Sequence, residues 1–317
     1  MKGWWARAAV AVVAAWVAVG AERAEAKPLT LATGPELATY FPVGVALRML
    51  LEQSPAASGV ELAVLPTKGS VDNLDGLRAG RFDLAIVQAD LELDAFRGTG
   101  VFAASGRFET LRSVMSLHEE GLALVVRPDV KVKDLKGLKG RKVDLGAVGS
   151  GGRPIVERLT ASLGVKPVEL RSGESAAALC DRRIDAAFLF IGHPSPVLVD
   201  ALSRCKARLL PVVGPLAEAL IHDVPVVTAT SIPVDLYPTV RKPVPTLGVR
   251  AVLVARADTP DAALTAILTT VQQNRDLLRM MNPALSDLRD RSLKPEVGAV
   301  PLHPAAERFF EGAGKVN

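Results

Sequence analysis

Two stretches of this 317-residue chain match one another: LRAGRFDLAIV at residues 77–87 and LCDRRIDAAFL at residues 179–189. In register they share Leu, Arg, an apolar residue, Asp, Ala and two further apolar residues. Each stretch is typical of a helix end, a tight turn and a buried strand. Because the pattern recurs in both halves of the chain, we interpret its shared Arg and Asp residues as structural rather than ligand-binding.

Strand-like and helix-like patterns alternate around both stretches. LTLATG, VELAVLP and FDLAIVQ are the strand patterns of the first half, and KVDLGAV, PVELRSG and IDAAFLF are those of the second. This order predicts βαβαβ twice, and therefore an α/β fold with two lobes whose parallel strands are covered on both faces. Ligands of such sheets bind outside the carboxyl ends of the strands, so the two lobes predict a ligand cleft between them.

The last third of the chain supplies one more strand and a long amphipathic helix, which we expect to return to the first lobe. The predicted domains are residues 27–120 with 250–317 for the first lobe and residues 121–249 for the second. Residues 1–26 are excluded because Lys2 and Arg7, a short apolar stretch and Ala24-Glu25-Ala26 are typical of a cleavable signal peptide. The alternative is a retained N-terminal anchor, but the apolar stretch is short for a membrane span. We therefore expect a periplasmic protein.

Composition excludes some function classes. The formal charge of +4 falls to +3 without residues 1–26, and aromatic residues make up only 4% of the chain. A basic surface interleaved with aromatic residues, as nucleic-acid binding needs, is therefore not expected. Cys180 and Cys205 are the only cysteines, and in an exported chain they favour a disulfide over a metal or redox site. Two separate buried thiols are the alternative.

The stretch VGSGGRP at 148–154 lies where a strand pattern meets a helix pattern, and such junctions favour anions. Gly151 and Gly152 allow close backbone approach, Ser150 offers a hydroxyl, and Arg153 can bind a carboxylate with two hydrogen bonds. The stretch lacks the Gly-Lys-Ser/Thr and G-x-G-x-x-G patterns of nucleotide-binding loops. A purely structural glycine turn is the alternative.

Three further loops come at expected carboxyl ends of strands: TGPELATYFPVG, TKGSVDN and FIGHPSP. Ser70 is a ligand candidate or a helix N-cap, and Asn73 follows it by three residues. Gln88 and Asp90 come directly after a buried strand pattern and should face the cleft, although Asp90 has a capping alternative.

Enzyme signatures are missing. The four histidines have no metal-ligand spacing, and GHPSP is not a G-x-S-x-G nucleophile elbow. We therefore expect neither a catalytic site nor a metal or cofactor. A periplasmic hydrolase built on two α/β lobes is kept as a remote alternative.

Seven motifs in order resemble the TAXI-type solute receptors of tripartite ATP-independent periplasmic (TRAP) transporters. They are LATGPELATYFPVGVAL, KGSVDNLDGLRAGRFDLAIVQAD, LRSVMSLHEEGLALVVRPD, DLKGLKGRKVDLGAVGSGGR, RIDAAFLFIGHPSP, PTLGVRAVLVARADTPD and VPLHPAAERFFE. The resemblance implies a type II periplasmic-binding-protein fold that closes on a small organic acid, such as glutamate or a dicarboxylate, and delivers it to a membrane permease. A receptor of the same fold that signals to a membrane sensor kinase is the main alternative.

The resemblance also implies ligand contacts. They are Thr39, Tyr40, Ser70, Asn73, Gln88, Asp90, Ser150, Gly151 and His193. One departure lies within the glycine loop: Gly152 stands where the resembling family usually has Thr, which removes a hydroxyl from the loop.

Overall fold

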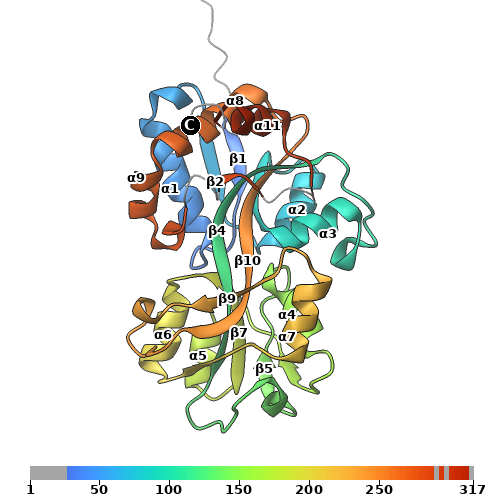
Figure 1. Ribbon diagram of the computed structural model, residues 1–317, viewed down its shortest axis with the longest axis vertical. Helices are drawn as coiled ribbons and strands as arrows, with labels where there is room; N and C mark the ends of the chain where they lie inside the picture. Colours follow the sequence, from blue (N-terminus) through green and yellow to red (C-terminus); the bar gives the residue numbers. More distant parts are fainter. Residues whose placement is uncertain (1–26, 289–292, 296–299, 314–317) are drawn as a thin grey trace, which may run out of the picture.

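Two lobes joined by two long strands make up the molecule (Figure 1). The computed structural model describes residues 27–288, 293–295 and 300–313, so the expected signal peptide at 1–26 lies outside the described residues. The joining strands are β4 (Leu111–Val126) and β10 (Val244–Arg256). In the described ranges one sheet of ten strands runs through both lobes in the order β2-β1-β3-β10-β4-β7-β5-β6, with β8 beside β4 and β9 beside β10.

The first lobe contains the first predicted βαβαβ unit and the C-terminal helices. Its strands are β1 (Leu29–Ala32), β2 (Leu62–Leu65) and β3 (Leu84–Gln88). Its α-helices are α1 (Tyr40–Gln53), α2 (Ser70–Arg78), α3 (Ala89–Arg97), α8 (Asp261–Gln273), α9 (Arg275–Met281) and α11 (Pro304–Ala313). Strand β1 pairs in parallel with β2 and β3, and β10 returns antiparallel to β3.

The second lobe repeats that unit. Its strands are β5 (Lys142–Asp144), β6 (Lys166–Val168), β7 (Ala186–Gly192), β8 (Arg208–Leu210) and β9 (Thr228–Ile232). Its α-helices are α4 (Gly152–Thr160), α5 (Ser175–Cys180), α6 (Pro196–Arg204) and α7 (Pro215–Asp223). The mixed α/β, two-lobed fold predicted from the repeat is confirmed, with β5 parallel to β6 and β7. Within the ranges described above, no helix has the length and apolar character needed to cross a membrane.

The repeated aspartates have the same structural role in each lobe. The carboxylate of Asp83 accepts the backbone N–H of Thr30 on β1 at 2.8 Å. The carboxylate of Asp185 accepts the backbone N–H of Lys142 on β5 at 2.9 Å. Each aspartate therefore ties the start of its own strand to the neighbouring parallel strand, which explains the sequence repeat without a ligand.

Four apolar clusters fill the space between sheet and helices, two for each lobe. Along β4 the alternation is strict, because Leu122 and Leu124 face one cluster while Ala123 and Val125 face another. This period of two shows that helices cover both faces of the strand. The clusters of the first lobe extend on β4 to Leu117, and those of the second begin at Leu122. We propose that the first lobe ends and the second begins between these two residues, in agreement with the boundary between residues 120 and 121 that the sequence predicts.

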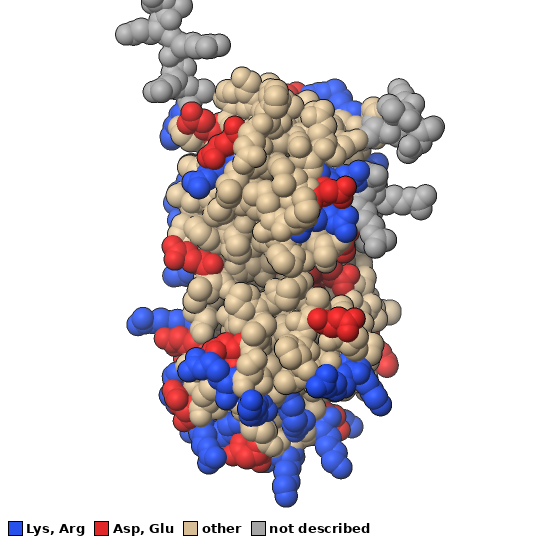
Figure 2. Space-filling view, turned by 90° about the vertical axis from the view of Figure 1, so that its left-hand side faces the viewer, with Lys and Arg blue, Asp and Glu red and all other residues tan. Residues whose placement is uncertain are grey.

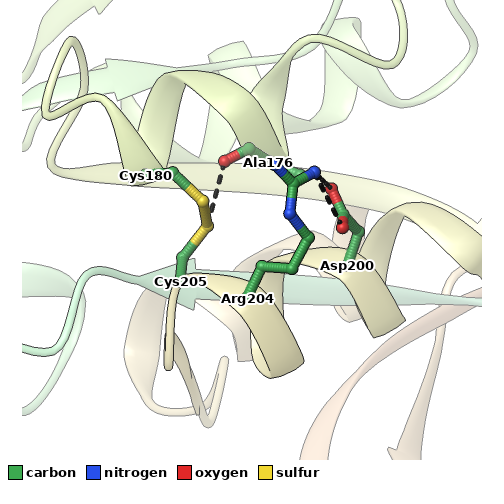
Figure 3. The surroundings of a disulfide bond; sticks show 5 residues. All are labelled: Ala176, Cys180, Asp200, Arg204 and Cys205. Atoms are coloured by element: carbon green, nitrogen blue, oxygen red, sulfur yellow. Dashed lines mark hydrogen bonds and ion pairs between the residues drawn. A yellow bond between two sulfur atoms is a disulfide. The ribbon is translucent and has the colours of Figure 1, made fainter.

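A disulfide bond joins Cys180 at the end of α5 to Cys205 after α6, so the two cysteines are not separate thiols (Figure 3). It links two helices that pack side by side in the second lobe. Because it closes a loop between residues 25 positions apart, it restricts the unfolded chain.

Replacing both cysteines with serine is expected to lower the free energy of unfolding by about 3 kcal/mol through loss of this restriction. Urea unfolding of the oxidised protein and of the Cys180→Ser/Cys205→Ser variant measures the difference. The wild-type protein under reducing conditions is the control and should match the variant. Equal stability of all three samples would show that the bridge does not stabilise the fold.

Candidate ligand-binding site

A cavity of about 110 Å³ lies between the lobes, where the carboxyl ends of the strands of both lobes meet. The first lobe contributes the loops after β1 and β2 and the end of β3, and the second contributes the loops after β5 and β6 and the end of β7. Since one water needs about 10–15 Å³ on this measure, there is room for a small molecule and none for a polymer.

Helices α1, α2, α4 and α5 all begin at the cavity. In the described structure none of the four has a side-chain hydrogen bond that caps its first turn. The first N–H groups of a helix have no partner within the helix, and the helix dipole adds partial positive charge there. The cavity is therefore suited to the negative groups of a ligand.

The two lobes already touch across the cavity. A Cβ atom built on Gly69 would lie 3.2 Å from Ser150 Cα, and one built on Gly149 would lie 3.1 Å from Lys68 Cβ. The backbone N–H of Gly192 in the second lobe also donates to Thr39 Oγ1 in the first, at 3.2 Å. This arrangement is a closed form of the cleft.

Gly151 is the tightest of these contacts. A Cβ atom at this position would lie 2.4 Å from Gln88 Oε1 and 2.7 Å from Ser70 Oγ, so the backbone of the glycine loop packs directly on two polar side chains of the first lobe. Any residue other than glycine would force these two side chains to shift or the lobes to move apart at this point. The sequence prediction of close backbone approach at this loop therefore has a structural reason.

A buried carboxylate, Glu120 on β4, organises the floor of the cavity. Its Oε2 atom accepts a hydrogen bond from the Tyr40 hydroxyl at 3.1 Å and another from Gln88 Nε2 at 2.7 Å. Burial and the Glu120 charge raise the pKa of Tyr40, which keeps the phenol protonated as a donor. Gln88 Oε1 is buried without a hydrogen-bond partner in the described part of the chain. It is available to accept from a ligand.

The wall formed by the second lobe has a buried acid of its own. Asp144 accepts hydrogen bonds from Ser175 Oγ at 2.6 Å and from the backbone N–H of Gly146 at 2.9 Å. Burial raises the pKa of Asp144. Gly152 packs on β7, and a Cβ atom there would lie 2.4 Å from Phe190 Cβ. A threonine at 152 would therefore not fit, which gives the departure noted in the sequence a steric cause.

Cationic side chains surround the cavity. Lys68 comes from the first lobe, and Arg153 and Arg171 come from the second. Arg153 is already engaged, because its Nε donates to Glu157 and its Nη1 donates to the Gly146 carbonyl and to Glu169. In this structure the Arg153 side chain therefore braces the glycine loop, and its expected binding of a ligand carboxylate stays a prediction.

The structure brings eight of the predicted site residues together around the cavity. They are Thr39, Tyr40, Ser70, Gln88, Ser150, Gly151, Gly152 and Arg153. The N-cap alternative for Ser70 is wrong, because Ser70 begins α2 and its hydroxyl accepts the backbone N–H of Gln88 at 3.1 Å. Three predicted residues, Asn73, Asp90 and His193, do not line the cavity.

Asn73 holds the first lobe together behind the cavity. Its Nδ2 donates to the carbonyl groups of Thr33 and Ile86, at 2.5 and 2.8 Å, and its Oδ1 accepts from Thr67 Oγ1 at 2.6 Å. These bonds use both ends of the buried amide. The ligand role expected for Asn73 is therefore replaced by a structural one.

His193 braces the junction of the lobes. Its Nε2 lies 3.1 Å from the Gly121 carbonyl, which can only accept, so this nitrogen carries the proton and Nδ1 accepts from the Tyr237 hydroxyl at 2.7 Å. Burial lowers the pKa of His193 to about 4 and keeps the ring neutral. Both nitrogens are occupied within the protein, so we withdraw the expected ligand contact.

Asp90 lies in the first turn of α3, is buried, and does not line the cavity. Burial, with the nearby charge of Asp94, raises its pKa to about 7. An acid whose pKa is higher in the folded than in the unfolded state stabilises the fold below its unfolded value of about 3.9, and this contribution is lost as pH rises through the folded value.

The Asp90→Asn variant should remove this pH dependence. Relative to wild type, its free energy of unfolding is expected to rise between pH 4 and pH 7.5 by up to about 4 kcal/mol. Comparing the two proteins cancels the contributions of other groups, such as His193. Urea unfolding across that range measures the difference, and ligand affinity should stay unchanged. If the two free energies of unfolding differ by the same amount at every pH, the pKa of Asp90 is not raised as described. If the variant loses ligand affinity, Asp90 contributes to the ligand site.

Sequence patterns missed several residues at the cavity. Lys68, Glu120, Asp144, Arg171 and Ser175 line it, but Glu120 and Asp144 occur within strand patterns, where alternation alone does not show which face a residue occupies. Lys68 directly precedes Gly69 and Ser70 in the loop TKGSVDN, and this position could have identified it as a residue of the cavity. In the ranges that the structure describes, no group of three or more His, Cys, Asp or Glu residues could hold a metal ion.

A model of the NMT1-like family matches residues 31–314, which is most of the chain. The chain belongs to the NMT1-like family. Among solved structures, this NMT1-like protein is similar to a protein from Bordetella bronchiseptica RB50, with a TM-score of 0.55 and 17% identity over 92% of this chain and 99% of the other. A putative L-cystine ABC transporter from Listeria monocytogenes gives a TM-score of 0.50 and 14% identity over 80% and 93% of the two chains.

The alkanesulfonate-binding protein SsuA from Xanthomonas axonopodis pv. citri, bound to MOPS, gives a TM-score of 0.47 and 14% identity over 90% and 83% of the two chains. At these identities the likeness of the NMT1-like protein to solved structures concerns the fold alone. What the protein binds has to be argued from its own cavity.

Proposed function

We propose that this protein is a periplasmic solute-binding protein that captures a small organic acid and delivers it to a TRAP-type membrane permease. The observation that carries the proposal is the closed cavity between the lobes, where four uncapped helix N-termini meet. The sequence resemblance to TAXI-type receptors supports the TRAP-type partner. The proposed function involves no covalent chemistry.

The charges around the cavity favour an amino acid such as glutamate, with a dicarboxylate as the other candidate. Helix N-termini with Lys68 and Arg171 suit carboxylate groups, while Glu120, Asp144 and the free Gln88 Oε1 suit an ammonium group. In the proposed mechanism the open receptor admits the acid between the lobes. The ligand then stabilises the closed form by as much as it prefers that form.

A thermal-shift screen of protein that has been unfolded and refolded, to remove any carried ligand, tests this function. Amino acids, dicarboxylates and keto acids form the panel. We expect one acid to raise the melting temperature by several degrees, because at about 100 times its Kd a ligand adds about 2.7 kcal/mol of stability. If no acid raises the melting temperature, the proposed function is wrong.

Two single substitutions should weaken the best acid from that screen without unfolding the protein. Gln88→Ala removes a free buried acceptor, and Ser150→Ala removes a hydroxyl at the glycine loop. Since loss of a hydrogen bond typically costs about 1 kcal/mol, each variant should bind about five- to tenfold more weakly in calorimetric titration. Unchanged affinity in both variants would contradict the site assignment.

Uptake of the identified acid by cells with and without the receptor tests the transport step. Deleting the receptor should abolish high-affinity uptake, and restoring it should restore uptake. Unchanged uptake, together with loss of an acid-dependent transcriptional response, would instead support the signalling receptor considered from the sequence.

A further inference from the structure

The end of the second lobe away from the cavity carries a group of lysines. Strands β5 and β7 begin at this end, β6 begins beside them, and β4 finishes there. Six lysines lie in and around these strand ends: Lys131, Lys133, Lys136, Lys139, Lys142 and Lys166. We call this group the basic end.

Backbone contacts bring the members of the basic end together. Lys142 and Lys166 are register partners on β5 and β6. The N–H of Gly140 donates to the Gly164 carbonyl at 2.8 Å, which places the Lys139 side chain beside the turn before β6. The charges of Lys139, Lys142 and Lys166 therefore share one surface, although they come from two different segments of the chain. Lys131, Lys133 and Lys136 belong to the segment that leads from the end of β4 to Lys139.

The six lysines are exposed, and none of them forms an ion pair in the part of the chain that the structure describes. Three aspartates near these lysines in the sequence or at the same strand ends have other partners. Asp134 accepts the backbone N–H of Gly137, and both Asp129 and Asp185 pair with Arg127. The positive charge of the basic end is therefore not neutralised within the protein.

Positive charge is also more frequent in the second lobe as a whole than in the first. Residues 121–249 contain 18 Lys and Arg against 12 Asp and Glu, whereas residues 27–120 and 250–317 contain 17 against 20. Figure 2 shows many Lys and Arg residues, with fewer Asp and Glu among them, at the lower end of the molecule, which the second lobe forms. The small net charge of +3 for the expected mature chain is therefore the sum of a basic second lobe and a slightly acidic first lobe.

We propose that the basic end binds the surface of a bilayer that contains anionic phospholipids and so holds the receptor beside the membrane. Phosphate headgroups attract clustered lysines at about 1 kcal/mol per residue, and the attraction acts within a screening length of about 10 Å at 0.1 M salt. Because the cavity lies at the opposite end of the second lobe's strands, this contact leaves the ligand site open. It therefore operates whatever the ligand state of the cleft.

Vesicle co-sedimentation of the exported, purified protein tests the proposal. One set of vesicles is pure phosphatidylcholine, and the other includes about one third phosphatidylglycerol. We expect partitioning at low ionic strength to be at least tenfold stronger on the anionic vesicles, and about 1 M salt should abolish the difference. The triple variant Lys136→Gln/Lys139→Gln/Lys142→Gln should partition onto the anionic vesicles at least about tenfold more weakly than the wild-type protein.

A matched variant removes the same charge elsewhere: Lys27→Gln/Arg97→Gln/Lys294→Gln changes three exposed cations outside the second lobe. It should keep its partitioning within about twofold of wild type. Equal losses in the two triple variants would overturn the proposal, because net charge alone would then account for binding. Equal binding to both kinds of vesicle would also overturn it, as would retention by native membranes but not by lipid vesicles, which would indicate an acidic protein partner.

Discussion

Replacing Gly151 with alanine is expected to weaken ligand binding by about 10- to 100-fold while both lobes remain folded. The added Cβ atom would lie 2.4 Å from Gln88 Oε1 and 2.7 Å from Ser70 Oγ, closer than real Cβ contacts allow. Relief requires the lobes to move apart or the two side chains to shift, and a shift would disturb the hydrogen bonds from Gln88 Nε2 to Glu120 and from the Gln88 N–H to Ser70 Oγ. In either case the cost falls on the closed form, in which the glycine loop and these side chains touch. Forcing an extra methyl group into such a space typically costs about 1–3 kcal/mol.

Gly34→Ala is the matched control for this prediction. Gly34 also lines the cavity, but a Cβ atom there would meet only Tyr40 atoms at 3.6 Å or more, which is ordinary contact. Calorimetric titration should therefore find affinity close to wild type for Gly34→Ala. If Gly151→Ala binds as tightly as Gly34→Ala, the closed form described here is not the form that holds the ligand.

Replacing Glu120 with alanine should lower the free energy of unfolding by about 2–5 kcal/mol. The change leaves the Tyr40 hydroxyl and Gln88 Nε2 as buried donors without their shared acceptor. An unsatisfied buried donor costs about 1–3 kcal/mol. Because Glu120 connects α1, β3 and the crossing strand β4, the first lobe should also lose the fixed geometry of its cavity floor, and ligand affinity should fall.

Glu120→Gln is the informative comparison. A glutamine keeps one oxygen that can accept from Tyr40 or Gln88, so its loss of stability should be less than half that of Glu120→Ala. Thermal and urea unfolding of the three proteins gives the order. Equal destabilisation by alanine and glutamine would show that the negative charge, rather than the acceptor, is what the two donors need.

The fold could be predicted because one structural device occurs twice. Asp83 and Asp185 each tie a strand to its parallel neighbour, and the sequences around them repeat in register. What the periodicity did not show is the length of the crossing strands. Strand β4 runs over Leu111–Val126 and β10 over Val244–Arg256, and both continue through the junction between the lobes.

The site was predicted best in its loops. The glycine loop, Ser70 and Gln88 lie at the cavity because they follow strands at their carboxyl ends, a position that sequence order does show. Asn73 and His193 carry side chains that suit a ligand equally well, but both are used within the protein. A pattern of residue types cannot separate these cases, because the competing partners are backbone carbonyls and a hydroxyl distant in sequence. Glu120 was missed for a related reason, since its partners Tyr40 and Gln88 are distant in sequence and meet it only when the first lobe has folded.

Calorimetric titration of refolded, ligand-free protein with the acid panel tests the central claim most directly, when run on wild type and on Gly151→Ala in parallel. The account predicts that one small organic acid binds the wild-type protein at one site per chain and that Gly151→Ala loses about 10- to 100-fold of this affinity. Absence of binding by every acid, or equally tight binding by both proteins, would contradict it.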